Sequence, residues 1–154
     1  MVELNGTELT IEQVMAVARH KEQVRISEPA KQKIDRARAY VDEKLAQKAV
    51  IYGLTTGFGK FSDTFVPEQE TAALQRNLII SHACGMGAPL PCEVVRGAML
   101  LRCNALARGN SGIRLSTLET LLAMLNRGVH PVIPEKGSLG ASGDLAPLAH
   151  IVLV

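Results

Sequence analysis

The chain has 154 residues, of which 47% are hydrophobic and 21% charged, a balance typical of a globular protein with a buried core. Its formal net charge of +2 is small and its basic residues are scattered, which argues against a nucleic-acid or membrane surface. Three cysteines without CxxC spacing argue against a disulfide framework or a zinc site, and no apolar run is long enough to span a membrane. Without a signal-peptide pattern at its start, the sequence predicts a soluble cytoplasmic protein.

The first half of the sequence predicts two amphipathic helices. Thr10 and Gln13 form a capping box ahead of apolar residues at helical spacing. Ser27 caps a second helix, in which residues 30–45 carry one apolar face opposite Lys and Arg. The stretch AVIYGL, residues 49–54, has the composition of a short strand, and a glycine-rich loop follows it.

Two further helices are predicted in the middle of the chain. The first covers residues 70–85, and the second covers residues 93–108 and is apolar on more than one side, which indicates burial on several sides. GNSG, residues 109–112, punctuates the sequence and is a candidate domain boundary. The predicted division is therefore an N-terminal domain over residues 1–110 and the beginning of a second domain over residues 111–154.

The last third predicts two more helices. Ser116 and Glu119 have capping-box spacing and would open a helix that stops at Gly128. Asp144 is placed as the N-cap of an apolar helix that begins at residue 145. Because that helix has no polar or glycine stop before the end of the chain, we expect the sequence to be a piece of a longer protein.

The loop GLTTGFGK has the glycines of a phosphate-binding loop but not its spacing. Gly53 and Gly59 are one residue too far apart, and Phe61 occupies the position of the Ser or Thr that would hold magnesium. Two other interpretations stay open. Gly53, Gly57 and Gly59 can supply positive φ angles in a tight loop, or the glycines can make an active-site loop mobile.

The serine of Ala141-Ser142-Gly143 also has several interpretations. As a hydrolase nucleophile with Asp144 and His150 it lacks the required spacing, because the second glycine comes one residue too early. As an ordinary loop residue it precedes a helix cap. In the third interpretation, the Gly143 nitrogen attacks the Ala141 carbonyl carbon, and loss of two waters leaves a methylidene electrophile at the serine β-carbon. Glycine suits the attacking position because it has no Cβ.

Four blocks together resemble one family. GSLGASGDLAPLAH closely resembles the signature of the aromatic amino acid ammonia-lyases, whose Ala-Ser-Gly cyclises to methylidene-imidazolone. YGLTTGFGKFSD, LQRNLIISHACGMGAPLP and RGNSGIR resemble further blocks of that family and stand in the expected order between residues 52 and 150. The Ser81-His82 pair is most similar to that of the histidine ammonia-lyases.

The resemblance implies a reaction and a set of site residues. L-Histidine loses ammonia to give urocanate, with no metal and no cofactor beyond the ring formed from the chain itself. The substrate amine adds to the methylidene carbon at Ser142, and Tyr52, with a phenol partly ionised by its surroundings, takes the β-proton. His82 and Gly59 bind the substrate, with His82 near its ring, and Asp144 assists ring closure. By residue type alone, His82 near a helix end is more commonly a hydrogen-bonded structural residue.

The resemblance also implies a mainly α-helical fold. A small N-terminal helical domain with a short strand and a glycine loop precedes the start of a long central helical bundle, and the family assembles as a homotetramer whose sites draw on several subunits. We expect these 154 residues to be incomplete and inactive alone, and to expose apolar patches that lead either to association or to a disordered C-terminal segment. A tyrosine or phenylalanine ammonia-lyase, an aminomutase of the same family, and a noncatalytic folding or interaction module are the alternatives.

Overall fold

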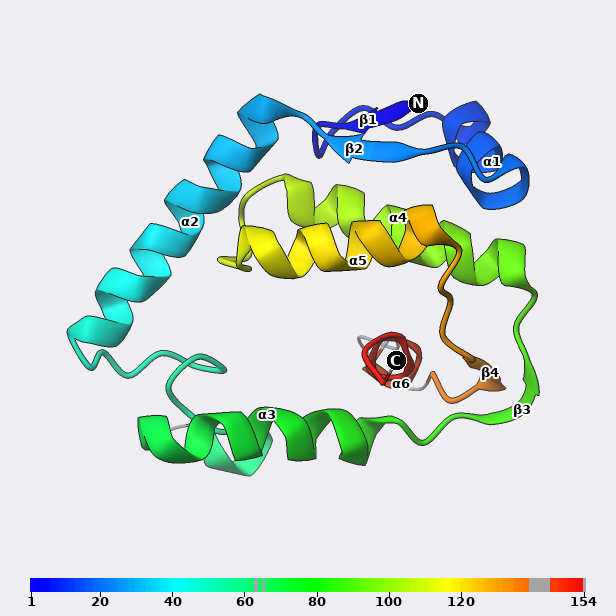
Figure 1. Cartoon of the computed structure of the whole chain (residues 1–154). Helices are drawn as coiled ribbons and strands as arrows, with labels where there is room; N and C mark the ends of the chain where they lie inside the picture. Colours follow the sequence, from blue (N-terminus) through cyan, green and yellow to red (C-terminus); the bar gives the residue numbers. More distant parts are fainter. Residues whose placement is uncertain (63, 65, 139–144, 154) are drawn as a thin grey trace.

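The computed structural model describes residues 1–62, 64, 66–138 and 145–153, and this part of the chain is mainly helical, as the sequence predicts (Figure 1). Its α-helices are α1 (Ile11–His20), α2 (Glu28–Ala46), α3 (Glu68–His82), α4 (Cys92–Ala107), α5 (Leu115–Arg127) and α6 (Leu145–Ile151). Its strands are β1 (Val2–Leu4), β2 (Val24–Ile26), β3 (Met86–Pro89) and β4 (Pro134–Lys136), and a 3-10 turn, η1, spans Gly59–Phe61. Among the described helices none is long and apolar enough to cross a membrane.

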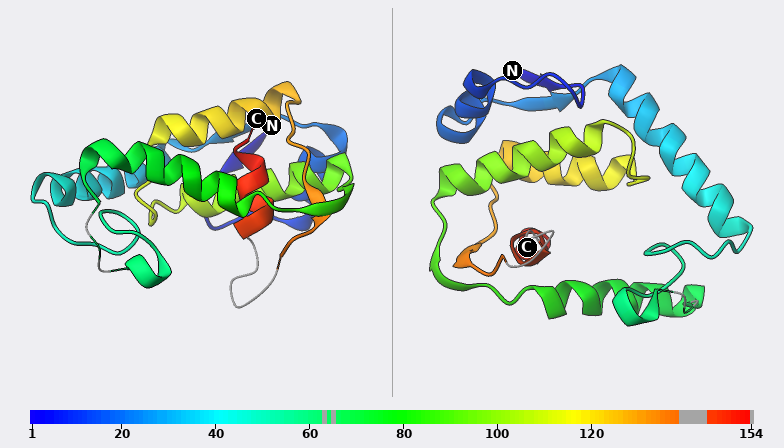
Figure 2. Two further views of the ribbon diagram at one scale, coloured as in Figure 1. Left: turned by 90° about the horizontal axis from the view of Figure 1, so that it is seen from below. Right: turned by 180° about the vertical axis from the view of Figure 1, so that it is seen from behind.

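Helices α4 and α5 run antiparallel through the middle of the molecule (Figure 1). The helix α1 and the parallel β1–β2 pair cover one side of α4 and α5, while α3 lies on the opposite side. The short α6 lies between α3 and the α4–α5 pair (Figures 1 and 2). The antiparallel β3–β4 pair joins the segment that connects α3 to α4 with the segment that follows α5. This arrangement brings α6 against the end of α3.

One apolar core joins α1, α2, α4, α5 and the β1–β2 pair. Its fully buried members include Leu4, Val17, Met99, Leu118 and Leu125. They come from both sides of the proposed division between residues 110 and 111, which stays a prediction. Aliphatic side chains and methionine build this core, in line with the low aromatic content of the sequence.

The predicted helix ends are confirmed where a local signal marks them. The Thr10 hydroxyl accepts from the Gln13 amide at 3.3 Å, and the Gln13 side chain accepts from the Thr10 amide at 3.0 Å, which completes the capping box. The Ser27 hydroxyl accepts from the Ala30 amide at 3.3 Å at the start of α2. Gly128 ends α5 with a φ of 73°. Each signal involves neighbours within one helical turn, so it can be recognised without knowledge of the tertiary contacts.

Two of the local predictions are wrong. Residues 49–54 do not form a strand, because the amides of Leu54 and Thr55 both donate to the Ile51 carbonyl and fold this segment into a turn. The capping box at Ser116 is absent as well. Helix α5 already begins at Leu115, so Ser116 stands inside its first turn.

The strands that do form carry almost no sequence signal. In β1 and β2 the side chains of Val2, Leu4, Val24 and Ile26 are buried, and the residues between them are exposed. Each strand has three residues, so alternation covers a single period and cannot be recognised from the sequence. Parallel pairing across the intervening α1 supplies the hydrogen bonds that make these segments strands.

A buried arginine ties three helices together. Arg96 of α4 is 2% exposed, and its Nε and Nη2 donate to the Val17 carbonyl at 3.1 and 2.8 Å. Its Nη1 donates to the Leu125 carbonyl at 2.9 Å and lies 3.2 Å from His130 Nε2. Burial, followed by the charges of Arg96 and Lys21, lowers the pKa of His130, so this imidazole is a neutral acceptor for the guanidinium.

The two carbonyls that Arg96 binds belong to the last turns of α1 and α5. Carbonyls in a last turn lack the amide partner that carbonyls in the helix interior have, and the helix dipole places partial negative charge there. The Leu125 carbonyl also accepts from the Gly128 amide at 3.3 Å. No described carboxylate lies within ion-pair distance of Arg96. The guanidinium is therefore satisfied by two helix ends in place of an acid.

We predict that Arg96→Met lowers the free energy of unfolding by about 1–3 kcal/mol, because the Val17 carbonyl loses both guanidinium donors while the Leu125 carbonyl keeps the Gly128 amide. Urea denaturation followed by circular dichroism measures this change. Arg102→Met is the matched control, since Arg102 is an exposed arginine on the same helix. Equal destabilisation by the two substitutions would contradict the role given to Arg96.

Candidate active site

Two buried threonines hold the glycine loop that follows α2. The Thr55 hydroxyl accepts from the Ile51 amide at 2.8 Å and donates to the Ala49 carbonyl at 2.7 Å. The Thr56 hydroxyl accepts from the Gly53 amide at 3.1 Å. The backbone groups of this segment are thus bonded to threonine side chains within the turn and not to a neighbouring strand. They favour the tight-loop interpretation of this segment.

Tyr52 stands at the tip of this turn and is 64% exposed. Its ring meets the ring of Phe58 edge to face, with centroids 5.9 Å apart. Gly53 and Gly59 have positive φ angles of 71° and 56°, as predicted, whereas Gly57 does not, so that part of the prediction is wrong. The turn therefore presents the Tyr52 ring outward, beside Phe58.

His82 lies at the end of α3 and is half-buried. Its Nδ1 is 2.8 Å from the Leu78 carbonyl and 3.1 Å from the Ser81 hydroxyl. Because a carbonyl only accepts, Nδ1 carries the proton and Nε2 of the neutral ring is an acceptor. Nε2 has no hydrogen-bond partner among the residues that the structure describes. His82 is thus both a hydrogen-bonded structural residue and a group that can accept a bond from a ligand.

The chain just after His82 packs against α6. The Gly85 amide donates to His150 Nε2 at 3.1 Å. A Cβ on Gly85 would lie 2.9 Å from that same nitrogen and 3.1 Å from Pro134, so only glycine fits. A Cβ on Gly137 would lie 3.1 Å from the Gly85 Cα and 3.2 Å from the Ala146 Cβ. We call Gly85, Pro134, Gly137, Ala146 and His150 together the Gly85 junction.

The Gly85 junction joins chain segments that flank the Ala-Ser-Gly sequence. Gly137 precedes that sequence and lies against Gly85, while Ala146 follows it and lies against Gly137. The predicted site residues themselves, Ala141, Ser142, Gly143 and Asp144, lie outside the described residues.

Among the described residues, the structure places His82 near the Gly85 junction but shows no contact between His82 and another predicted site residue. His82 lies three residues before Gly85 and so close to the junction. Within the described part of the chain, no hydrogen bond or ring contact joins Tyr52 or Gly59 to His82. From the sequence, His150 is considered only as a member of a hydrolase triad. Its contact with Gly85 is missed, because the two residues are 65 positions apart and no local pattern links them.

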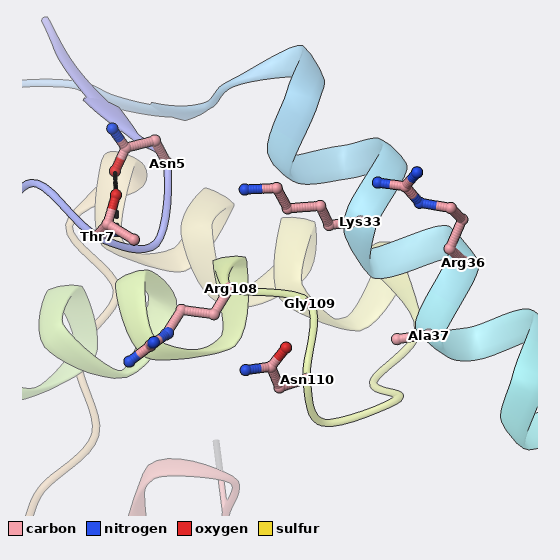
Figure 3. A pocket seen from close by; sticks show the side chains of 8 residues that line it. All are labelled: Asn5, Thr7, Lys33, Arg36, Ala37, Arg108, Gly109 and Asn110. Carbon is pink, nitrogen blue, oxygen red and sulfur yellow. Dashed lines mark hydrogen bonds between the residues drawn. The ribbon is translucent and has the colours of Figure 1, made fainter.

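A basic pocket of about 510 Å³ lies elsewhere, between α2 and the connection from α4 to α5 (Figure 3). It is lined by Asn5, Thr7, Lys33, Arg36, Ala37, Arg108, Gly109 and Asn110. None of the predicted site residues is among them, so this pocket is not the predicted site.

Comparison with known proteins gives a consistent result over nearly the whole chain. The sequence model of the family described as aromatic amino acid lyase matches residues 9–154. The chain belongs to this family. It is 60% identical over 151 residues to a histidine ammonia-lyase of Alkaliphilus oremlandii and 61% identical over 153 residues to one of Caldanaerobacter subterraneus subsp. tengcongensis. The match covers 98% and 99% of the chain but 30% of each relative, so the chain spans about a third of their length.

Solved structures of the family share the fold. The histidine ammonia-lyase of Trypanosoma cruzi superposes with a TM-score of 0.89 at 40% identity, over 99% of this chain and 28% of that one. An ergothioneine-degrading enzyme, ergothionase, from Treponema denticola superposes with a TM-score of 0.92 at 37% identity, over 97% of this chain and 30% of that one. The arrangement of helices described above is therefore that of the lyase family.

We predict that Gly85→Ala lowers the free energy of unfolding by about 1–3 kcal/mol, because the new methyl group overlaps His150 and Pro134. Gly97→Ala is the matched control. A Cβ there meets nothing within 4 Å, and alanine in a helix is favoured over glycine, so this variant should be as stable as the wild type or more stable. Thermal and urea unfolding measure both. An unchanged stability of Gly85→Ala would contradict the close packing of the junction.

Proposed function

We propose that this chain is the N-terminal part of a histidine ammonia-lyase, which eliminates ammonia from L-histidine to give urocanate. The identity of 60–61% to two proteins named histidine ammonia-lyase carries the proposal. The described geometry of His82 supports it. An unprotonated Nε2 can accept a hydrogen bond from the N–H of an imidazole substrate, whereas a phenyl ring offers no such donor.

The proposed electrophile comes from Ala141, Ser142 and Gly143. As a methylidene-imidazolone, this group supplies an electrophilic carbon that no ordinary side chain offers. The chain's own residues then bind and orient. His82 holds the substrate ring, Gly59 lies in the binding loop, and Asp144 assists closure of the ring.

Tyr52 is the proposed base that removes the substrate β-proton. Its ring is exposed at the tip of a hydrogen-bonded turn, so it is available to a site completed by another segment or subunit. The exposure supports a site built from more than these 154 residues, in agreement with the share of the relatives that the chain spans. We therefore propose that the isolated chain is inactive and that the complete lyase is a homotetramer.

The surface of the helices is consistent with such an assembly. A second pocket of about 510 Å³, mainly apolar, lies between α4, α5 and α6. It is lined by Arg102, Leu106, Ile113, Ser116, Thr117, Thr120, Leu121, Met124, Leu148, Ile151 and Val152.

Cys84, Cys92 and Cys103 are free thiols, which supports a reducing, cytoplasmic location for the proposed lyase.

Another member of the family is the second candidate function. The ergothionase structure shows that the same fold, at 37% identity, carries another activity. A lyase or aminomutase acting on tyrosine or phenylalanine would keep the methylidene-imidazolone and Tyr52. It would differ in the substrate group that His82 contacts. Turnover with each amino acid separates these candidates.

The intact mass of the chain tests the proposed electrophile. We predict that the mass of the full-length protein is lower than its sequence mass by two waters, and that Ser142→Ala abolishes this deficit. The same measurement on residues 1–154 shows whether this part alone closes the ring. A full-length protein at its unmodified mass would refute the proposed chemistry and favour a noncatalytic module.

Turnover of L-histidine by the full-length protein tests the proposed base. We predict that Tyr52→Phe lowers kcat by about 10²–10⁴-fold, the usual contribution of a general base. Tyr40→Phe is the matched control, since Tyr40 is exposed to a similar degree on α2. Urocanate formation is followed by absorbance. Preference for phenylalanine or tyrosine over histidine would replace the histidine proposal with its alternative.

A further inference from the structure

The imidazole of His150 is held in one tautomer by its contact with the chain after α3. The Gly85 amide donates to Nε2 at 3.1 Å, so Nε2 is unprotonated and the proton of the neutral ring lies on Nδ1. This bond spans 65 residues and joins α6 to the end of α3. It is a contact between two elements, not a local cap.

The packing around Gly85 makes the contact specific. A side chain on Gly85 would meet His150 Nε2 at 2.9 Å and Pro134 at 3.1 Å. Gly137 approaches from another side, where an added Cβ would be 3.1 Å from the Gly85 Cα. Because α6 and residues 134–137 both pack against this one glycine, a shift of α6 would also move the chain next to His82.

The described ends of the Ala-Ser-Gly segment meet at the same place. An added Cβ on Gly137 would be 3.2 Å from the Ala146 Cβ, so the chain leaves this point before residue 139 and returns to it after residue 144. His150 lies one turn beyond Ala146 on α6. Its bond to Gly85 therefore links the helix that follows the proposed electrophile with the helix end that carries the proposed substrate ligand.

We propose that His150 is a positioning residue of the lyase: by accepting the Gly85 amide hydrogen, it fixes the chain next to His82 against α6, the helix that follows the proposed electrophile residues Ala141-Ser142-Gly143 in the sequence. The inference rests on the proposed function. The imidazole contacts neither the substrate nor the reacting atoms. It acts through Gly85, three residues after His82, and through α6, whose first turn follows the ring residues.

Kinetics of the full-length lyase test this role. His150→Ala removes the acceptor and should lower kcat/KM for L-histidine by about 10–100-fold, the effect of a small misplacement of reacting groups. Activity is expressed per ring-bearing subunit, counted from intact mass, so that a loss of ring formation is measured separately. His150→Gln keeps an acceptor oxygen and should recover most of the lost kcat/KM. Val132→Ala, at an exposed position before β4, is the control and should match the wild type.

Hydrogen exchange of the Gly85 amide supplies a readout that does not depend on turnover. In the 154-residue chain, His150→Ala should exchange this proton roughly fivefold faster, as expected for loss of one hydrogen bond, and His150→Gln should not. Equal kcat/KM in the wild type and His150→Ala would overturn the positioning role, as would equal impairment of the Ala and Gln variants. A wild-type lyase without turnover on any of the three amino acids would instead overturn the proposed function, while Gly85 exchange would still report on the bond.

Discussion

The described fold depends on a charge buried without a counter-charge. Arg96 is 2% exposed and donates to carbonyls in the last turns of α1 and α5. A guanidinium removed from water needs hydrogen-bond acceptors, and the carbonyls of two helix ends together with His130 Nε2 supply them. Because the two carbonyls come from different helices, Arg96 determines how α1 and α5 sit relative to α4. The β1–β2 pair and α2 then pack against the same core.

A second constraint, of steric origin, acts at the other face of the molecule. Gly85 has no room for a side chain, since His150 and Pro134 already occupy the space around it. The close approach brings α6 against the end of α3 and draws Gly137 and Ala146 together. The described chain next to the proposed substrate ligand and the described segments on either side of the proposed electrophile residues thus meet at one junction, although they stand far apart in the sequence. Such support from neighbouring packed elements is what a site of defined geometry needs.

The two halves of the proposed site differ in how complete they are. Around His82, the Leu78 carbonyl fixes the tautomer of the imidazole, and the chain three residues later is hydrogen-bonded to His150 of α6. Around Tyr52 it supplies only a turn and the ring of Phe58, and leaves the phenol exposed. This asymmetry agrees with a chain that spans 30% of the length of its relatives.

The sequence alone determined the features that depend on neighbours within one turn: the capping box of α1, the Ser27 cap of α2 and the glycine stop of α5. It also determined the family, because four separate sequence blocks resemble blocks of that family and occur in the same order. Tertiary structure alone decided the rest. The β1 and β2 strands are too short to show a period and exist through pairing with each other. The turn at residues 49–54 resembles a strand in composition, but the side chains of Thr55 and Thr56 capture its amides. The contacts of Arg96 and of His150 join residues 29 to 79 positions apart, and no local pattern encodes a partner at that distance.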